Sequence, residues 1–268
     1  MSKEEMEANR RRWNEVVRIH TASKFYDVEG FKRGNSSLLP VEQKEVGEVS
    51  GKRLLHLQCH FGLDTLSWAR KGAQVTGVDY SEEAVRFARG LAQELGIEAR
   101  FVESNVLDLD SVLDERFDIV FTSYGVLCWL PDLRGWARTI ADHLEPDGFF
   151  YIVEDHPLAA MIDENGTDEI RLTYPYFSAG APLRFDQQGT YTDRSAEVVN
   201  ATSYEWVHTL SDIVDSLLEV GLRIEFLHEF PFSFFPRRAD MKQRPDGTWA
   251  FPDPDISFPM MFSIKART

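Results

Sequence analysis

A chain of 268 residues, 43% of them hydrophobic, is long enough to bury one substantial core. Its 29 Lys and Arg against 44 Asp and Glu give a formal net charge of −15, which disfavours nucleic acids and anionic membrane surfaces as partners. Cys59 and Cys128 are its two cysteines, no signal-peptide pattern is visible, and no apolar run approaches the roughly 20 residues that span a bilayer. We therefore expect a cytoplasmic protein without disulfides.

Apolar residues spaced among many charges predict an amphipathic helix over residues 3–20, followed by a looser segment over 21–51. From Arg53 onward, short apolar runs alternate with segments of helical periodicity. Strands are predicted at 54–57, 74–78, 99–102, 118–122 and 149–153, and helices at 64–70, 81–95 and 133–144. Such alternation favours parallel strands joined by crossover helices.

The last third of the chain has a different pattern. Residues 157–207 are rich in Pro, Gly and aromatic residues and have no long period. A capping box at Thr209–Asp212 predicts a helix ending at Gly221, and strands at 223–228 and 259–266 are expected to run antiparallel to each other. We therefore divide the chain into an N-terminal helical arm (1–52), an α/β domain (53–156 and 208–268) and an insertion within that domain (157–207).

Ligands of open α/β sheets bind at the carboxyl ends of the strands, so the loops that follow the strands are the candidate site. A nucleoside ligand requires a close backbone approach at the first loop, a carboxylate for the ribose hydroxyls at the second, and polar groups for the base at the third. Gly62, Asp79 and Asn105 meet these needs in chain order.

From Arg53 to Val153, and again over the last two strands, the chain resembles the class I S-adenosylmethionine-dependent methyltransferases. Val78-Asp79-Tyr80-Ser81 is similar to the family's ribose-binding strand end, and Glu103-Ser104-Asn105-Val106 to its adenine loop, with Asn for the more usual Asp. The first loop departs from the family's acidic-x-Gly-x-Gly-x-Gly. It reads His56-Leu57-Gln58-Cys59-His60-Phe61-Gly62 and keeps only the last glycine.

The resemblance implies a Rossmann-like, doubly wound α/β fold. Its seven-stranded sheet is expected to be mostly parallel, with an antiparallel last strand. It also implies S-adenosylmethionine as the cofactor and S-adenosylhomocysteine as the product. The residues expected to hold the cofactor are Gln58, Gly62, Asp79, Tyr80, Asn105, Val106 and Ser123. The segments Arg12–Glu15 and Phe25–Asp27 also resemble a bacterial subgroup of these enzymes, and this resemblance supplies no acceptor.

Methyl transfer from a sulfonium is an in-line displacement in which positioning and water exclusion are the main requirements. A general base is needed only if the acceptor must lose a proton, and His20, His156 and His208 are the candidates. Tyr26 and Tyr124 are candidates for covering the methyl group or orienting the acceptor. For each of the five, a purely structural role is the alternative. The Arg237-Arg238 pair is either a solvated loop or a binding site for an anionic substrate.

Several functional alternatives stay open at this point. The insertion forms either a lid over the strand ends or an embellishment or dimer contact, so a homodimer is one of the alternatives.

His56 and His60 do not have the spacing of a helical metal pair, and we expect no metal site. An acid 17 residues after Gly62 also suits an NAD(P)-dependent oxidoreductase, although no G-x-G-x-x-G is present. The missing glycines leave a non-catalytic S-adenosylmethionine-binding protein as another alternative. The fourth loop, Ser123-Tyr124-Gly125-Val126, lacks the Asn/Asp-Pro-Pro-Tyr/Phe pattern of the amino-directed DNA and protein methyltransferases. This loop and the negative charge favour a small-molecule acceptor over nucleic acid.

Overall fold

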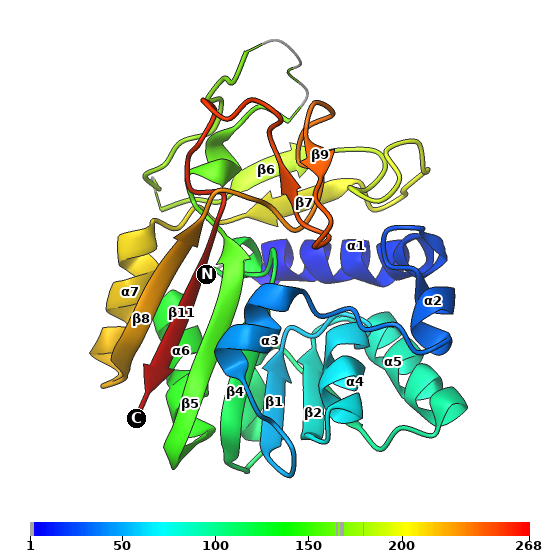
Figure 1. Ribbon diagram of the computed structural model, residues 1–268, viewed down its shortest axis with the longest axis vertical. Coiled ribbons are helices and arrows are strands. Elements are labelled where there is room, and N and C mark those ends of the chain that lie inside the picture. Colours follow the sequence, from blue (N-terminus) through cyan, green and yellow to red (C-terminus); the bar gives the residue numbers. More distant parts are fainter. Residues whose placement is uncertain (1–2, 165, 167–168, 179) are drawn as a thin grey trace.

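The computed structural model describes residues 3–164, 166, 169–178 and 180–268, so parts of the expected arm and insertion lie outside the described residues. The main sheet has the strand order β3-β2-β1-β4-β5-β11-β8 (Figure 1). Its strands are β1 Arg53–Leu57, β2 Gln74–Asp79, β3 Arg100–Glu103, β4 Phe117–Ser123, β5 Leu144–Asp155, β8 Arg223–Phe230 and β11 Met261–Arg267. β11 runs antiparallel to both β5 and β8, whereas β1 to β5 pair in parallel. The predicted sheet is confirmed.

Helices cover both faces of this sheet. They are α4 Leu63–Arg70, α5 Glu82–Leu95, α6 Leu133–Asp142 and α7 Leu210–Glu219. Because successive strand residues point to opposite faces, Leu54 packs in the cluster that includes Trp68 of α4, while Leu55 packs in the cluster that includes Trp136 of α6 and Leu217 of α7. All five side chains are fully buried.

The helix boundaries expected from the sequence are present. The Ser81 hydroxyl caps α5 by accepting from Ala84 N at 3.1 Å, and Gly96 ends the helix in the left-handed conformation. Thr209 and Asp212 form the capping box that begins α7. These capping groups satisfy backbone N–H groups that the first turn leaves unpaired.

The N-terminal arm contains α1 Lys3–Ala22, α2 Val28–Lys32 and α3 Pro40–Val46. The second and third lie where the sequence indicated only a looser segment, because helices of five and seven residues are too short to show a clear period. α1 crosses the carboxyl ends of the strands (Figure 1). The Ser81 hydroxyl, at the end of β2, donates to Asn14 Oδ1 of α1 at 2.7 Å.

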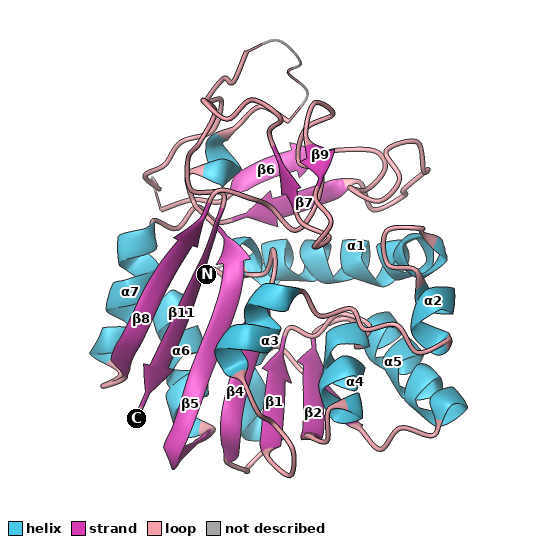
Figure 2. Cartoon of the chain, viewed as in Figure 1, coloured by secondary structure: helices cyan, strands magenta, loops and turns pink. Residues whose placement is uncertain are grey.

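The insertion folds as an antiparallel hairpin, β6 Leu183–Asp186 and β7 Thr202–Glu205, that lies on α1 (Figure 2). The Asn9 side chain of α1 both donates to Tyr204 O at 2.7 Å and accepts from Tyr204 N at 2.8 Å. The Arg12 guanidinium donates to four carbonyls of the insertion, those of Gln187, Gly189, Asn200 and Ala201. The insertion and α1 therefore form one roof over the strand ends.

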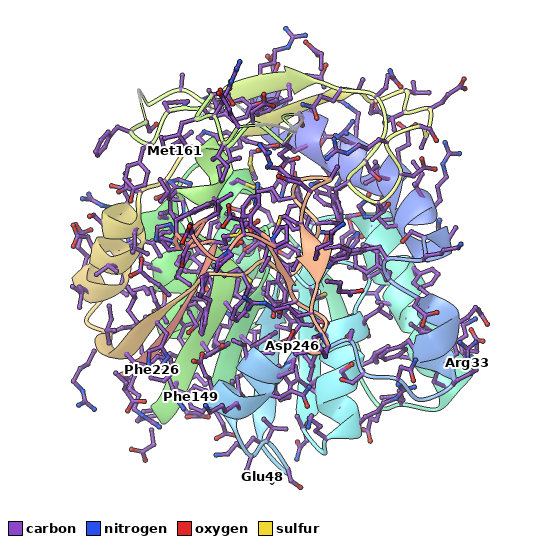
Figure 3. All side chains as sticks on the ribbon, turned by 45° about the horizontal axis from the view of Figure 1, so that its top comes forward. Arg33, Glu48, Phe149, Met161, Phe226 and Asp246 are labelled. Carbon is purple, nitrogen blue, oxygen red and sulfur yellow. The ribbon has the colours of Figure 1, made fainter. Side chains whose placement is uncertain are left out.

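Residues 231–260, between β8 and β11, complete this roof. They contain the short strands β9 Lys242–Gln243 and β10 Trp249–Ala250, and the turn at Asp246 comes forward over the α/β core (Figure 3). The remaining elements are short 3-10 helices, η1 Val106–Ser111, η2 Leu127–Trp129 and η3 Ala159–Met161. No helix among the described residues is both long and apolar enough to cross a membrane.

Candidate functional site

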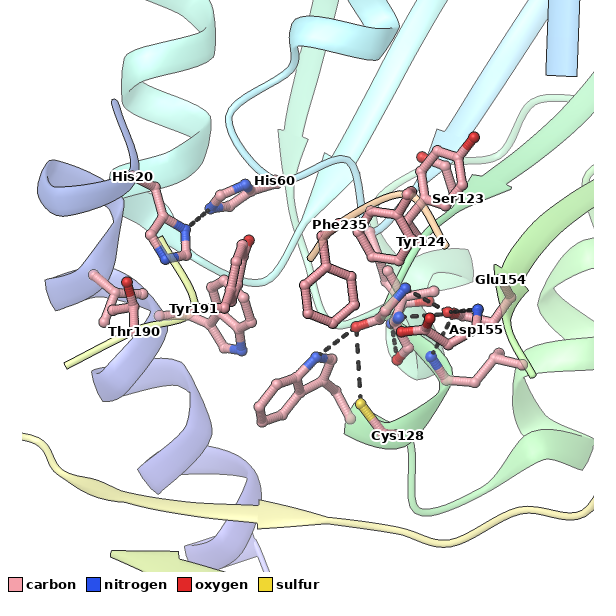
Figure 4. Close-up of a pocket in the computed structure, with 18 of the residues that line it drawn as sticks. His20, His60, Ser123, Tyr124, Cys128, Glu154, Asp155, Thr190, Tyr191 and Phe235 are labelled. Atoms are coloured by element: carbon pink, nitrogen blue, oxygen red, sulfur yellow. Dashed lines mark hydrogen bonds between the residues drawn. The ribbon is translucent and has the colours of Figure 1, made fainter. Parts of the chain in front are cut away.

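A cavity of about 1300 Å³ lies between the carboxyl ends of the strands and the roof. All the expected cofactor-binding residues line it, and so do His20, Tyr26, Tyr124 and His208, whereas His156 does not. Ligand pockets commonly hold about 300–1,000 Å³, so this cavity has room for two small molecules side by side. Figure 4 shows His20 and His60 at one side of the cavity, and Glu154, Asp155 and Cys128 at the other.

The first loop keeps a glycine-like backbone despite its altered sequence. Gln58, His60 and Gly62 have φ angles of 55°, 52° and 85°, all in the left-handed region. A non-glycine residue in this region costs roughly 1–2 kcal/mol. Gln58 and His60, which stand where the family has glycines, therefore add side chains to the cavity while their backbone keeps the left-handed conformation that glycine favours. Gly62 cannot change in this way, since a Cβ there would lie 2.7 Å from the Phe101 ring.

Asp79 holds the first loop against the end of β2. Its Oδ2 accepts from His60 N at 2.7 Å and its Oδ1 accepts from Ser81 N at 2.8 Å. Burial raises the pKa of this carboxyl to about 6. An ionised carboxylate has about four acceptor positions, so Asp79 keeps acceptor capacity for a ligand hydroxyl beside its backbone donors.

Gln58 follows β1 and Asn105 lies just beyond the end of β3, so the two residues are on opposite sides of β2. The Gln58 amide donates to Val126 O at 3.0 Å, while its buried Oε1 has no donor among the described residues. Asn105 Oδ1 accepts from Leu107 N at 3.1 Å, and this hydrogen bond caps the beginning of η1. Val106, the first residue of η1, lines the cavity. The orphaned Gln58 oxygen suits an ammonium donor of a bound ligand.

His56 stands where the family has an acidic residue, and it belongs to a buried series of hydrogen-bonded polar side chains. His56 Nδ1 lies 2.8 Å from Thr65 Oγ1 and its Nε2 lies 3.3 Å from Ser123 Oγ, which donates to Asp64 Oδ2 at 3.0 Å. Burial lowers the pKa of His56 to about 3 and raises that of Asp64. The neutral imidazole thus bridges two hydroxyls, and Asp64 supplies the carboxylate at this end of the cavity.

Tyr124 follows β4 and lines the cavity, but its hydroxyl is already bound. It donates to Glu42 Oε2 of α3 at 2.6 Å, and the opposite oxygen of Glu42 accepts from Leu39 N at 2.5 Å. Burial raises the pKa of Glu42 to about 8. The pair joins the N-terminal arm to the fourth loop, and the ring of Tyr124 packs on Phe234 at 4.5 Å between centroids.

Glu154, which the sequence analysis did not single out, fixes the shape of the fourth loop. Its carboxylate is 3% exposed and accepts four backbone N–H groups, those of Gly125, Val126, Leu127 and Asp155. Burial raises its pKa to about 7. The sequence offered one signal for Glu154, its position directly after a predicted strand. Its partners could not be predicted, because all of them are main-chain groups.

His20 and Tyr26 lie in a cluster of rings between α1 and the first loop. His20 Nδ1 is 3.4 Å from His60 Nε2, and the Tyr26 and Tyr191 hydroxyls are hydrogen-bonded to each other. Trp13 makes edge contacts with His60 and with Trp129, at 5.3 and 5.2 Å between centroids. Burial lowers the pKa of His20 to about 3.

The remaining candidate histidines have structural partners. His208 Nε2 donates to Leu130 O at 2.7 Å, and burial lowers its pKa. His156 is 5% exposed, lies outside the cavity lining, accepts from Leu158 N through Nδ1, and has its Nε2 3.0 Å from Glu229. The structure therefore brings His20, Tyr26, Tyr124 and His208 to the cavity and places His156 elsewhere.

Comparison with known proteins identifies the fold and the family. A methyltransferase-domain family model matches residues 55–152. The ubiquinone biosynthesis O-methyltransferase of Aeromonas salmonicida is 32% identical over 160 residues, covering 58% of this chain and 67% of the relative. The corresponding protein of Salmonella paratyphi A is 33% identical over 140 residues, covering 50% of the chain and 57% of the relative. The chain thus spans between half and about two thirds of these relatives.

Solved structures show the same fold. An S-adenosylmethionine-dependent methyltransferase from Mesorhizobium loti is 21% identical with a TM-score of 0.61, covering 88% of this chain and all of that one. A glycopeptide N-methyltransferase in complex with S-adenosylmethionine is 17% identical with a TM-score of 0.53, covering 92% of this chain and 95% of its own. These findings favour a methyltransferase over the oxidoreductase and non-catalytic alternatives. The chain belongs to the class I S-adenosylmethionine-dependent methyltransferases, with S-adenosylmethionine as its cofactor.

Proposed function

We propose that this enzyme methylates a small molecule that it encloses together with its cofactor. The observation that supports this most is the single cavity, which continues from Asp79 and Asn105 on the sheet to Asp155 and Glu205 under the roof. A macromolecular acceptor requires an open surface at the reacting centre, whereas here α1, the hairpin and residues 231–260 cover the strand ends.

The residues present fit S-adenosylmethionine. Asp79 has free acceptor positions for the ribose hydroxyls, and Asn105 with Val106 would border the adenine. Gln58 Oε1 would accept from the methionine ammonium, beside Ser123. Gly62 would contribute the tight turn, and Tyr80, adjoining Asp79, would border the ribose.

Bound there, the cofactor supplies an electrophilic methyl group on a sulfonium. The protein's own contribution is positioning and the exclusion of water. Glu154 holds the fourth loop in one shape through three backbone hydrogen bonds, and Trp13 contacts both the first and the fourth loop. The binding site is thereby formed before the acceptor enters. His20 and His208 would serve as polar walls, with Tyr26 and Tyr124 orienting the acceptor.

The matched family model covers residues 55–152, and the roof, which would contact the acceptor, lies outside it. The similarity to the curated relatives therefore does not identify the acceptor of this chain. We propose a cytoplasmic enzyme, which is supported by the two free cysteines, Cys59 and Cys128. The insertion acts as a lid rather than as a dimer contact in this proposal, since Asn9 and Arg12 tie it to α1. The charge of −15 supports an acceptor other than nucleic acid.

The proposal is tested by incubating the purified protein with S-adenosylmethionine carrying a tritiated methyl group and separate pools of small metabolites, total RNA and a protein extract. Transfer of label to the small-molecule pool, lost in Glu154→Gln and retained in the exposed-site control Glu98→Gln, is the expected result. Transfer of label to RNA or protein instead would refute a small-molecule acceptor.

A further inference from the structure

Asp155, at the end of β5, lies on the side of the cavity opposite His20 and His60 (Figure 4). Arg237 forms ion pairs with Asp155 and with Glu164 of the insertion, and Glu205, at the end of β7, interacts electrostatically with Glu164 and Arg237. We refer to Asp155, Glu164, Glu205 and Arg237 as the acidic chamber. Two further charged groups border it: Arg194, 3.7 Å from Glu164, and Glu154, whose carboxylate is bound by backbone N–H groups.

Both terminal nitrogens of Arg237 are bound by carboxylates. Its Nη2 lies 2.8 Å from Asp155 Oδ2, its Nη1 lies 2.9 Å from Glu164 Oε1, and its side chain is 8% exposed. The guanidinium also stacks over the Phe235 ring at 4.8 Å. Arg238, its neighbour, is bound by Asp240 and by the Glu169 carbonyl. Both arginines are therefore buried and paired with protein groups, which disfavours the anionic substrate that the sequence had left open.

Hydrogen-bond acceptors in the acidic chamber outnumber donors. The side-chain carboxylate of Glu205 makes no hydrogen bond or ion pair with any described residue, although Glu205 lines the cavity. The second oxygen of Asp155, Oδ1, is buried and also has no donor among the residues that the structure describes. Arg237 Nε is the one unpartnered donor in this group. Burial and the proximity of Glu164 raise the pKa of Glu205 to about 7, against the opposite influence of the Arg237 and Arg12 guanidinium groups.

We propose that the acceptor carries a protonated amine, which Glu205 and Asp155 Oδ1 hold in the acidic chamber. This inference rests on the proposed function. An ammonium supplies three N–H donors for the carboxylate oxygens of Glu205 and Asp155 that have no donor among the described residues, and its positive charge makes these hydrogen bonds stronger. Phe235, which stacks on Arg237, and Tyr191, which lies beside His20, are 6.2 Å apart between ring centroids and provide an apolar wall between the acidic chamber and the other end of the cavity.

The test compares three ligands of one shape. Phenethylamine, phenethyl alcohol and hydrocinnamic acid are titrated by calorimetry into the protein loaded with S-adenosylhomocysteine. We expect phenethylamine to bind about tenfold more tightly than the alcohol, and hydrocinnamic acid to bind weakest. Glu205→Gln is expected to abolish the preference for the amine, while Glu197→Gln, an exposed position of the same insertion, is expected to keep it.

A second measurement remains informative if Glu205→Gln fails to fold. In the wild-type protein, phenethylamine is expected to bind more tightly as the pH rises from 6 to 8, because Glu205, with a pKa of about 7, then becomes ionised. A pH-independent affinity, equal or stronger binding of hydrocinnamic acid, the absence of phenethylamine binding, or an amine preference that survives Glu205→Gln would each overturn the inference. Failure of S-adenosylhomocysteine itself to bind would instead refute the proposed function.

Discussion

The backbone amide of His60 donates to Oδ2 of Asp79 across 2.7 Å, so one carboxylate both fixes the first loop and faces the expected ribose site. His60 occupies a position where the family has glycine, and it retains a φ of 52°. The hydrogen bond to Asp79 is one interaction that stabilises this unfavourable backbone conformation. The loop shape and the proposed recognition of the cofactor therefore depend on the same side chain.

The Gly62 position is expected to tolerate no side chain. Gly62→Ala would place a Cβ against Phe101 in a left-handed conformation, and we expect it to lower the free energy of unfolding by about 2 kcal/mol. Gly90→Ala is the matched control, because Gly90 lies within α5 and a Cβ there meets nothing within 4 Å. It is expected to stabilise the protein by about 0.5–1 kcal/mol. Urea unfolding measures both, and equal effects would contradict this account.

Glu42 is expected to make the free energy of unfolding depend on pH. Its folded-state pKa of about 8 lies above the unfolded value of 4.5, so the folded state retains a proton that the unfolded chain has lost. Stability from this group is therefore present at low pH and decreases as the pH rises towards 8. Relative to wild type, Glu42→Gln should gain about 2 kcal/mol in unfolding free energy between pH 6 and pH 8. A constant difference across this range, measured by urea unfolding, would show that Glu42 is ionised throughout.

The bonds from Arg12 are expected to hold the insertion closed. Arg12→Ala removes the donor to four carbonyls, and we expect the amides of residues 187–201 to exchange with solvent about tenfold faster. Arg11→Ala is the control, because the Arg11 side chain is 56% exposed and its ion-pair partner, Glu7, lies on α1. Hydrogen exchange read by mass spectrometry checks the result, and unchanged protection in Arg12→Ala would mean that other contacts hold the insertion.

Glu154 is expected to matter for both stability and cofactor affinity. In Glu154→Gln an amide nitrogen would face backbone donors of the fourth loop, which should cost about 2–3 kcal/mol of stability. S-adenosylmethionine affinity should decrease as well, because the loop borders the cofactor. Calorimetry and urea unfolding measure the two effects, with the exposed-site variant Glu98→Gln as the reference. Wild-type affinity in Glu154→Gln would show that the loop keeps its shape without this carboxylate.

The α/β core was predictable because its signals are local. Alternating apolar runs marked β1 to β5, and Ser81, Gly96 and Thr209 marked helix ends within one or two residues. The strand-end candidates followed from that order, and the cavity brings them together. The roof was not predictable in the same way. Arg12 donates to the Gly189 carbonyl across 177 residues of sequence, and no local sequence pattern indicates that these two residues are in contact. Glu42 and Glu154 were missed because their partners, too, are fixed only by the tertiary fold.

We propose that the altered first loop still forms an S-adenosylmethionine site with Asp79 at its centre. The most direct test is a calorimetric titration of S-adenosylmethionine, and separately of NADH, into the wild-type protein, Asp79→Asn and the exposed-site control Asp142→Asn. The account predicts that S-adenosylmethionine binds to wild type and Asp142→Asn with micromolar affinity, that NADH does not bind, and that Asp79→Asn weakens binding at least tenfold. Binding of NADH instead, or full affinity in Asp79→Asn, would contradict it.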